Sequence, residues 1–140
     1  MSTSSHIAHL TSVADLTPLL DTLSVQLSWS DKARFQIELA LEELIVNTFT
    51  HGISNRPAEQ LQAVLIDVSF QQADKELTIT LKDNADAFDP TQFAAPDITL
   101  SVEDRKIGGL GLFLTSKMMD DIQYRRDGSF NYVHLRKQLT

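Results

Sequence analysis

The sequence has no cysteine, few glycines and no long apolar run. It holds 5 glycines, 4 prolines and 1 tryptophan among 140 residues. Without cysteine, disulfides, thiolate metal sites and cysteine nucleophiles are excluded. No run approaches the roughly 18 apolar residues of a bilayer span, and the start, MSTSSHIAHLTSVADL, lacks the charged and apolar parts of a signal peptide. We therefore expect a cytoplasmic protein with no membrane partner.

Basic charge is also scarce. The net charge is -7, and the 12 Lys and Arg residues do not gather into a long block. Proteins that bind the phosphate backbone of nucleic acids depend on basic patches, so we expect no direct contact with nucleic acid. The length suits one domain with a substantial core, and we predict a single domain over residues 1–140.

A predicted helix from Phe35 to His51 is the most informative stretch. At about 3.6 residues per turn, one arc of this helix is apolar; its members are Ile37, Ala40, Leu41, Leu44 and Ile45. Glu43, Asn47 and His51 follow one another at intervals of four along a polar stripe beside that arc. Glu42 points about 100° away from Glu43, so Glu43 is the neighbour of Asn47. The alternative is an amphipathic helix with an ordinary solvated face.

The other elements follow from shorter patterns of alternation and helical spacing. They are a strand at Ile7–Leu10, a helix at Val13–Leu27, strands at Leu61–Phe70 and Glu76–Lys82, a helix at Leu112–Met119, and a hairpin of Ile122–Arg126 and Tyr132–Lys137 with its turn at Asp127-Gly128. This order predicts an α+β fold, a two-layer sandwich in which helices cover one face of a mostly antiparallel sheet.

An irregular stretch from Asp83 to Ile107 interrupts this pattern. Loops of that length in a compact domain are usually functional lids or disordered segments. Asp83 ends the preceding strand, so its carboxylate can stand at the mouth of a pocket and accept a hydrogen bond from an exocyclic amine. A turn aspartate that bonds its own backbone is the alternative.

Three of the five glycines lie together at Gly108, Gly109 and Gly111, before a helix. Glycines at a loop-to-helix junction let backbone amides approach an anion at the positive end of the helix dipole. A flexible hinge or a tight helix entry is the alternative. The segment is not a P-loop, because the chain contains no G-x-x-x-x-G-K-[ST] sequence. It is not a G-x-G-x-x-G motif either, because Leu114 occupies the place of the last glycine.

Two side chains of the long helix suit nucleotide chemistry. The Asn47 amide oxygen is a neutral ligand suited to Mg²⁺, which prefers a few oxygen donors together with substrate phosphates. Glu43, one turn earlier, is then positioned as a general base near a metal-bound nucleotide.

These segments, in this order, resemble the ATP-binding domains of the GHKL family, which have the Bergerat fold. EELIVNTFTH looks like the family's N-box, DNADAFDP resembles its first glycine box of the form D-x-G-x-x-F, and GGLGLFL is similar to its second box. The resemblance covers about Phe35 to Lys137 and implies an ATP lid at about residues 85–107.

Details of the three motifs are similar to those of one branch, the bacterial anti-sigma-factor serine kinases. The resemblance implies ATP and Mg²⁺ as cofactors, Glu43 as the catalytic base, Asn47 as the metal ligand and Asp83 as the residue that recognises the adenine amine. The implied nucleotide-binding set is Asn47, His51, Asp83, Ala85, Phe88, Arg105, Gly108, Gly109, Leu110, Gly111 and Leu112. His51 as a helix-end partner of the dipole, and Arg105 and Lys106 as ordinary lid charges, are the alternatives.

Two residues depart from the pattern of this branch. Ala85 stands where the first box usually has glycine, and it adds a methyl group where the backbone lies close to the adenine. His134 occupies what we take as the place in the last strand where the branch often has threonine near the base.

The branch implies a function and partners. Its members form homodimers, bind a sigma factor and phosphorylate a serine on a small STAS-domain antagonist protein, and by resemblance the dimer interface is expected around Ile7–Leu20. The first alternative is a non-catalytic binding module whose nucleotide site sets its conformation. A detached histidine-kinase catalytic domain is disfavoured, because the chain has no additional long helical hairpin with a phosphoacceptor histidine.

Overall fold

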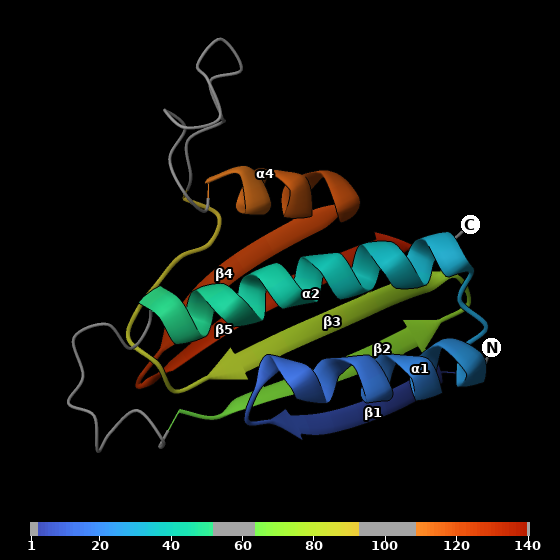
Figure 1. Cartoon of the computed structure of the whole chain (residues 1–140), viewed down its shortest axis with the longest axis horizontal. Helices are drawn as coiled ribbons and strands as arrows, with labels where there is room; N and C mark the ends of the chain where they lie inside the picture. Colours follow the sequence, from blue (N-terminus) through green and yellow to red (C-terminus); the bar gives the residue numbers. More distant parts are fainter. Residues whose placement is uncertain (1–2, 52–63, 93–108, 140) are drawn as a thin grey trace, which may run out of the picture.

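The structure, a computed structural model, describes residues 3–51, 64–92 and 109–139. Its elements form two layers, a sheet and a set of helices (Figure 1). The strands are β1 (Thr3–Leu10), β2 (Ile66–Ala73), β3 (Glu76–Asp83), β4 (Asp121–Asp127) and β5 (Phe130–Gln138). The helices are α1 (Leu16–Gln26), α2 (Asp31–His51) and α4 (Gly109–Met118), and a 3-10 turn, η1 (Val13–Asp15), precedes α1.

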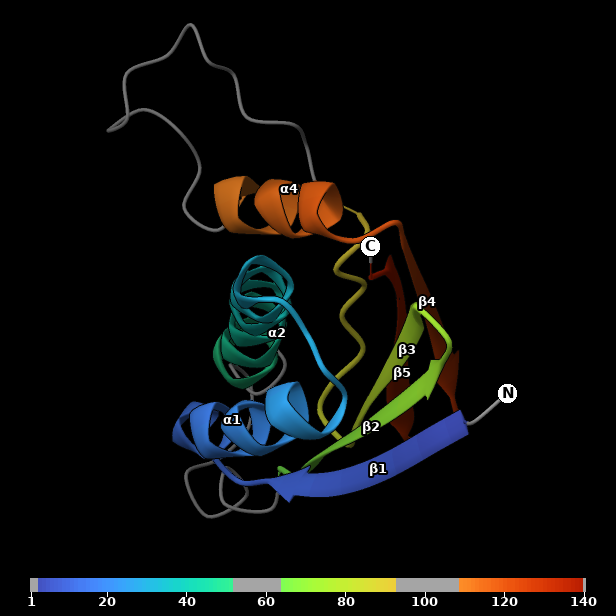
Figure 2. The same cartoon turned by 90° about the vertical axis from the view of Figure 1, so that its right-hand side faces the viewer.

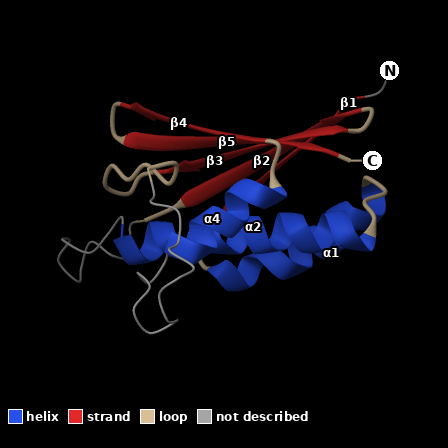
Figure 3. Cartoon of the chain, turned by 90° about the horizontal axis from the view of Figure 1, so that it is seen from above, coloured by secondary structure: helices blue, strands red, loops and turns tan. Residues whose placement is uncertain are grey.

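The sheet has five strands in the order β1-β2-β3-β5-β4, and every neighbouring pair is antiparallel. The helices cover one face of this sheet and leave its other face open (Figure 3). Seen along the layers, α1 lies over the β1 side, α4 over the β4 side, and α2 between them (Figure 2). The predicted α+β class, with helices on one face of an antiparallel sheet, is confirmed.

The core lies between the two layers. The apolar arc predicted for α2 is buried throughout, since Ile37, Ala40, Leu41 and Ile45 are 0% exposed and Leu44 is 4% exposed. Alternation along each strand supplies the facing side chains. They include Val68 and Phe70 of β2, Leu77, Ile79 and Leu81 of β3, and Val133 and Leu135 of β5. Within the described ranges, no helix has the length and apolar character needed to cross a bilayer.

The N-terminal elements differ from the prediction in their bounds. The first strand begins at Thr3 rather than Ile7, because its polar residues pair with β2 along their whole length. The helix expected at Val13–Leu27 is divided into η1 and α1. Pro18 explains the division: it has no N–H for a helical bond to Ala14 and its ring clashes with that carbonyl, so an α-helix holds it only in the first turn.

The two hairpins also differ in detail. The strand expected at Leu61–Phe70 runs from Ile66 to Ala73, and residues 61–63 lie outside the described ranges. Its pairing with β3 continues to a two-residue turn in which Asp74 has a φ of 56°. In the closing hairpin the turn is Gly128-Ser129, one residue later than predicted, with Gly128 at a φ of 59°. Glycine adopts this left-handed conformation without steric cost.

Two side chains close the core at the end where α2 begins. Trp29 is 8% exposed, its ring centroid lies 6.2 Å from that of Phe70, and its Nε1 donates to Gln72 Oε1 at 2.8 Å. Lys137 of β5 is also 8% exposed. Its Nζ donates to Gln36 Oε1 of α2 and to the Met118 carbonyl of α4, each at 2.8 Å.

Candidate active site

Three chain segments meet at one end of the two layers. The C-terminal end of α2, the end of β3 and the start of α4 lie together there, beside the segment that follows Asp83 (Figure 1). A pocket opens between α2, the sheet and that segment. Its lining is Leu44, Ile45, Asn47, Thr48, Ile66, Leu81, Asp83, Ala85, Asp86, Phe88, Pro90, Asn131 and Val133. Apolar walls with a few converging polar groups are typical of a small-molecule site.

The sheet register places the polar groups of this pocket in one row. Asp83 of β3 is paired with Asn131 of β5, and Asn131 is paired with Arg126 of β4. Ile66 of β2 is the partner of Asp83 on its other side. Residues opposite one another in a sheet point to the same face, here the face toward the helices. The row therefore brings a carboxylate and an amide into the pocket lining and places a guanidinium beside them.

Asp83 is buried, at 6% exposure, and its carboxylate orientation is fixed from two sides. Its Oδ1 accepts hydrogen bonds from the Ala85 backbone N–H and from Asn131 Nδ2, both at 2.9 Å. The first bond is the local turn that the sequence allowed as the alternative. The two interpretations are compatible, because this turn aspartate also lines the pocket.

Asn131 connects Asp83 to the closing hairpin. Its Nδ2 also donates to the Asp86 carbonyl at 2.9 Å and, more weakly, to the Ala85 carbonyl at 3.4 Å. Its Oδ1 accepts from the Tyr124 hydroxyl at 2.6 Å and from Arg126 Nη1 at 3.1 Å. Burial raises the pKa of Tyr124 above its ordinary value of 10.0, so its hydroxyl remains a donor at neutral pH.

Arg126 holds the same turn from outside the pocket. Its Nη1 donates to the Ala85 carbonyl at 2.8 Å, and its Nε donates to the Gly128 carbonyl at 3.1 Å. Ala85 itself is 1% exposed. Among described non-glycine residues, only Ser28 and Asp74 have a positive φ, so the backbone at Ala85 does not require the glycine of the family pattern.

Glu43 and Asn47 are neighbours on α2, as their spacing predicts. Asn47 is 5% exposed and lines the pocket, and its Nδ2 donates to Glu43 Oε1 at 3.3 Å. With the nitrogen directed at Glu43, the amide oxygen is the atom of Asn47 suited to a cation. In the described ranges no three His, Asp or Glu side chains converge on a cation site. A single amide oxygen suits Mg²⁺, which proteins usually bind through one or two oxygen ligands together with substrate phosphates.

Two of the three clustered glycines lie inside a helix rather than before it. Gly109 and Gly111 belong to the first turn of α4, together with Leu110 and Leu112. The amides of a first turn have no helical acceptor and point outward from the helix start, which suits an anion. Leu112 is 8% exposed and belongs to the core.

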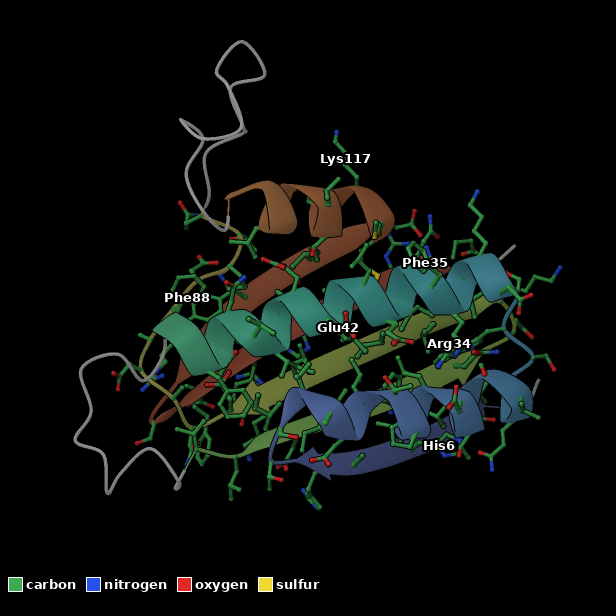
Figure 4. The ribbon with its side chains drawn as sticks, viewed as in Figure 1. His6, Arg34, Phe35, Glu42, Phe88 and Lys117 are labelled. Carbon is green, nitrogen blue, oxygen red and sulfur yellow. The ribbon has the colours of Figure 1, made fainter. Side chains whose placement is uncertain are left out.

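Other predicted members of the site fall where no placement is described. Gly108, Arg105, Lys106 and the part of the predicted lid (about 85–107) from residue 93 onward lie outside the described ranges, as does the side chain of His51. Phe88 is described, and it lines the pocket near the C-terminal end of α2 (Figure 4).

His134 is not at the pocket, and its predicted position near the base was wrong. It alternates with the buried Val133 and Leu135, so it lies on the open face of the sheet. There it hydrogen-bonds Thr80 Oγ1 at 3.1 Å and stacks on Tyr132. Asn131, two residues before Val133, has the pocket position instead. The alternation that places Val133 and Leu135 inside was the signal for it, but the predicted strand began at Tyr132, two residues after the observed start at Phe130.

Comparison with known proteins bears on this geometry. The model of the histidine kinase-like ATPase domain matches residues 8–137, which is most of the chain. The chain belongs to the histidine kinase-like ATPase domain family. Every element from η1 to β4 lies in the matched range, as do the end of β1, β5 up to Lys137 and the pocket.

Relatives within the histidine kinase-like ATPase domain family are named as protein kinases. The serine/threonine-protein kinase BtrW of Bordetella bronchiseptica is 29% identical over 126 residues, which cover 89% of this chain and 84% of BtrW. The serine-protein kinase RsbW of Listeria monocytogenes is 25% identical over 118 residues, covering 81% of this chain and 72% of RsbW. The predicted resemblance to this kinase branch is confirmed.

A solved structure matches the fold. The structure of the RsbU and RsbW domains of a Mycobacterium tuberculosis protein superposes with a TM-score of 0.64 at 13% identity. The match covers 96% of this chain and 32% of that longer chain. It supports the same arrangement of sheet and helices.

Proposed function

We propose that this chain is an ATP- and Mg²⁺-dependent protein serine kinase that acts as an anti-sigma factor and phosphorylates a serine on a STAS-domain antagonist. The hydrogen-bonded pair of Glu43 and Asn47 on α2, with Asn47 lining the pocket, carries the proposal. Family membership and relatives named serine-protein kinases support it. Phosphoryl transfer from ATP uses a residue that orients or deprotonates the nucleophile and a metal ion that neutralises phosphate charge, and Glu43 and Asn47 are candidates for these two tasks.

Each residue has a defined task in this reaction. Glu43 accepts the proton of the substrate serine hydroxyl while the serine oxygen bonds to the γ-phosphorus and the bond to the ADP oxygen breaks. Asn47 holds Mg²⁺ through its amide oxygen. Asp83 accepts a hydrogen bond from the exocyclic amine of the base. Bound Mg²⁺ neutralises phosphate charge, while the first-turn amides of α4 face the phosphates. Because ATP is the phosphoryl donor, we expect the protein to act in the cytoplasm.

A homodimer belongs to the same proposal. Strand β1 is an edge of the sheet, and its sequence TSSHIAHL contains no Asp, Glu, Lys, Arg or Pro. Natural edge strands usually carry such residues to prevent pairing with another chain. The lack of such residues on β1 supports pairing with a second copy through this strand, which overlaps at Ile7–Leu10 the region where the resemblance implies the interface.

The proposal is tested by phosphoryl transfer from labelled ATP with Mg²⁺ to a STAS-domain protein encoded beside this chain's gene. We expect Glu43→Ala to lower the transfer rate about 100-fold or more while ATP binding stays within about threefold, because loss of a general base acts on chemistry. We expect Asn47→Ala to weaken Mg²⁺-dependent ATP binding about tenfold or more, because it removes a metal ligand.

Glu42→Ala is the matched control. Glu42 is the adjacent carboxylate on α2, but it points about 100° away from Glu43 and is not one helical turn from Asn47. The variant should retain transfer and binding. Binding of ATP without transfer to any STAS partner would favour the nucleotide-gated binding module, and equal activity of native protein and Glu43→Ala would remove Glu43 from the mechanism.

A further inference from the structure

Side chains from the closing hairpin hold the turn that carries Asp83. Four hydrogen bonds reach the Asp83–Asp86 turn from β4 and β5. Asn131 Nδ2 donates to Asp83 Oδ1 and to the Asp86 and Ala85 carbonyls, and Arg126 Nη1 donates to the Ala85 carbonyl. None of these contacts belongs to the roles assigned above.

Asn131 has no hydrogen-bonding capacity left for a ligand. An asparagine amide offers two N–H donors and an oxygen with two lone pairs. Its nitrogen reaches three acceptors in the turn, and its oxygen accepts from Tyr124 and from Arg126. Although Asn131 lines the pocket at 3% exposure, it serves the protein and not the base.

Arg126 connects the Asp83–Asp86 turn to Asn131 and to the turn of the closing hairpin. Its Nη1 is shared between the Ala85 carbonyl and Asn131 Oδ1, and its Nε is fixed on the Gly128 carbonyl of the hairpin turn. This guanidinium also decides which way the Asn131 amide faces, because a cationic donor requires the amide oxygen on its side. The Asn131 nitrogen is thereby turned toward Asp83.

We propose that Arg126 and Asn131 are positioning residues that aim the Asp83 carboxylate at the exocyclic amine of adenine and so set the preference for adenine over other purines. The inference rests on the proposed nucleotide binding and deepens it.

The test compares Arg126→Met with Arg125→Met. Both variants remove a guanidinium and keep an aliphatic chain. Arg125 is the adjacent residue on β4 but lies on the open face, with its guanidinium carbon 3.9 Å from the centroid of Tyr132. Dissociation constants for ADP and for inosine diphosphate, which has a carbonyl oxygen in place of the amine, are measured by calorimetry with Mg²⁺. Melting temperatures are measured alongside.

The native chain and Arg125→Met should bind ADP about tenfold or more tightly than inosine diphosphate, the range of one hydrogen bond to a charged group. In Arg126→Met the affinity for ADP should fall about tenfold while that for inosine diphosphate changes less than about threefold, so the preference is lost. Arg126→Lys, which keeps one cationic donor, should recover part of it.

Other outcomes overturn the inference in separable ways. If Arg126→Met keeps the native preference, even with a lower melting temperature, Arg126 is only structural and the inference fails alone. If the native chain binds both nucleotides equally, Asp83 does not read the amine and the inference fails while nucleotide binding stands. If the native chain binds neither nucleotide, both the proposed function and the inference are wrong.

Discussion

His134 shows how one step along a strand separates two environments. Its neighbours Val133 and Leu135 face the helices, whereas His134 lies among Thr80, Tyr132 and Arg125 on the open face. Burial, followed by the repulsion of Arg125, holds the pKa of His134 below its ordinary value of 6.5. Protonation is therefore harder in the folded protein than in the unfolded chain.

This shift predicts a pH effect on stability. The folded pKa is lowered, so below about pH 6.5 the unfolded chain binds the proton more readily, and the free energy of unfolding falls as pH drops from 6.5 toward the folded pKa. His134→Gln keeps a hydrogen-bonding group for Thr80 and removes the titration. Urea unfolding at about pH 7.5 and pH 5.5 should show a smaller loss for the variant than for the native protein. An equal loss in both would show that His134 does not contribute.

Residue-level predictions succeeded where only local geometry mattered. Helical spacing was enough to predict that Glu43 and Asn47 are neighbours, because the geometry of a helix follows from its own sequence. Asn131 and Arg126 were missed because their meeting with Asp83 depends on strand register and on the order β3-β5-β4, which no local pattern gives.

At the scale of elements, β5 is the strand that holds α2 and α4 together. Lys137 extends from β5 between these helices and donates to Gln36 on α2 and to the Met118 carbonyl at the end of α4. Burial lowers the pKa of Lys137 from its ordinary value of 10.5. The side chain thus contributes two hydrogen bonds and its methylene groups to the contact between the sheet and the helices. Burial of its ammonium charge opposes this stabilisation.

Truncation of Lys137 should loosen the contact between the layers. We expect Lys137→Ala to reduce the free energy of unfolding by about 2–4 kcal/mol, because two acceptors lose their donor and the stem leaves a gap. Lys137→Met, which keeps the stem without the charge, should lose clearly less. Urea unfolding of both variants measures this, with the exposed neighbour Gln138→Ala as control. A change below about 0.5 kcal/mol in Lys137→Ala would contradict the role.

The order and type of the elements were predicted from periodicity, but their bounds were not. Long α2 was predicted to its last residue because one apolar arc continues through it. The β2 strand was placed too early because its outer part, Gln71 to Ala73, is polar and is ordered by pairing with β1 and β3 rather than by burial. Hydrophobic patterns report burial and do not report pairing.

At the scale of the whole molecule, the two edges of the sheet are treated differently. Edge strand β4 carries four Asp and Arg residues in DIQYRRD, whereas edge strand β1 carries no Asp, Glu, Lys or Arg in TSSHIAHL and exposes Ile7 at 71%. Charged side chains on an edge oppose pairing with another chain. The asymmetry favours one edge, that of β1, for assembly.

A charge placed on the β1 edge should therefore disrupt the proposed homodimer. We expect the native chain to be a dimer in sedimentation equilibrium and Ile7→Lys to be mainly a monomer with an unchanged circular dichroism spectrum. Gln123→Lys is the matched control, because Gln123 lies in the same row and on the same face but on the β4 edge. A monomeric native chain, or a dimer that survives Ile7→Lys, would contradict pairing through β1.

The single tryptophan also has a practical consequence. Trp29 lies just before α2, while the pocket lies near the other end of that helix, on the order of 25 Å away along its axis. Its enclosure beside Phe70 predicts a blue-shifted emission that moves to the red on unfolding. Nucleotide should leave this emission unchanged. A change on adding a protein partner would then locate that partner at the end of the molecule opposite the pocket.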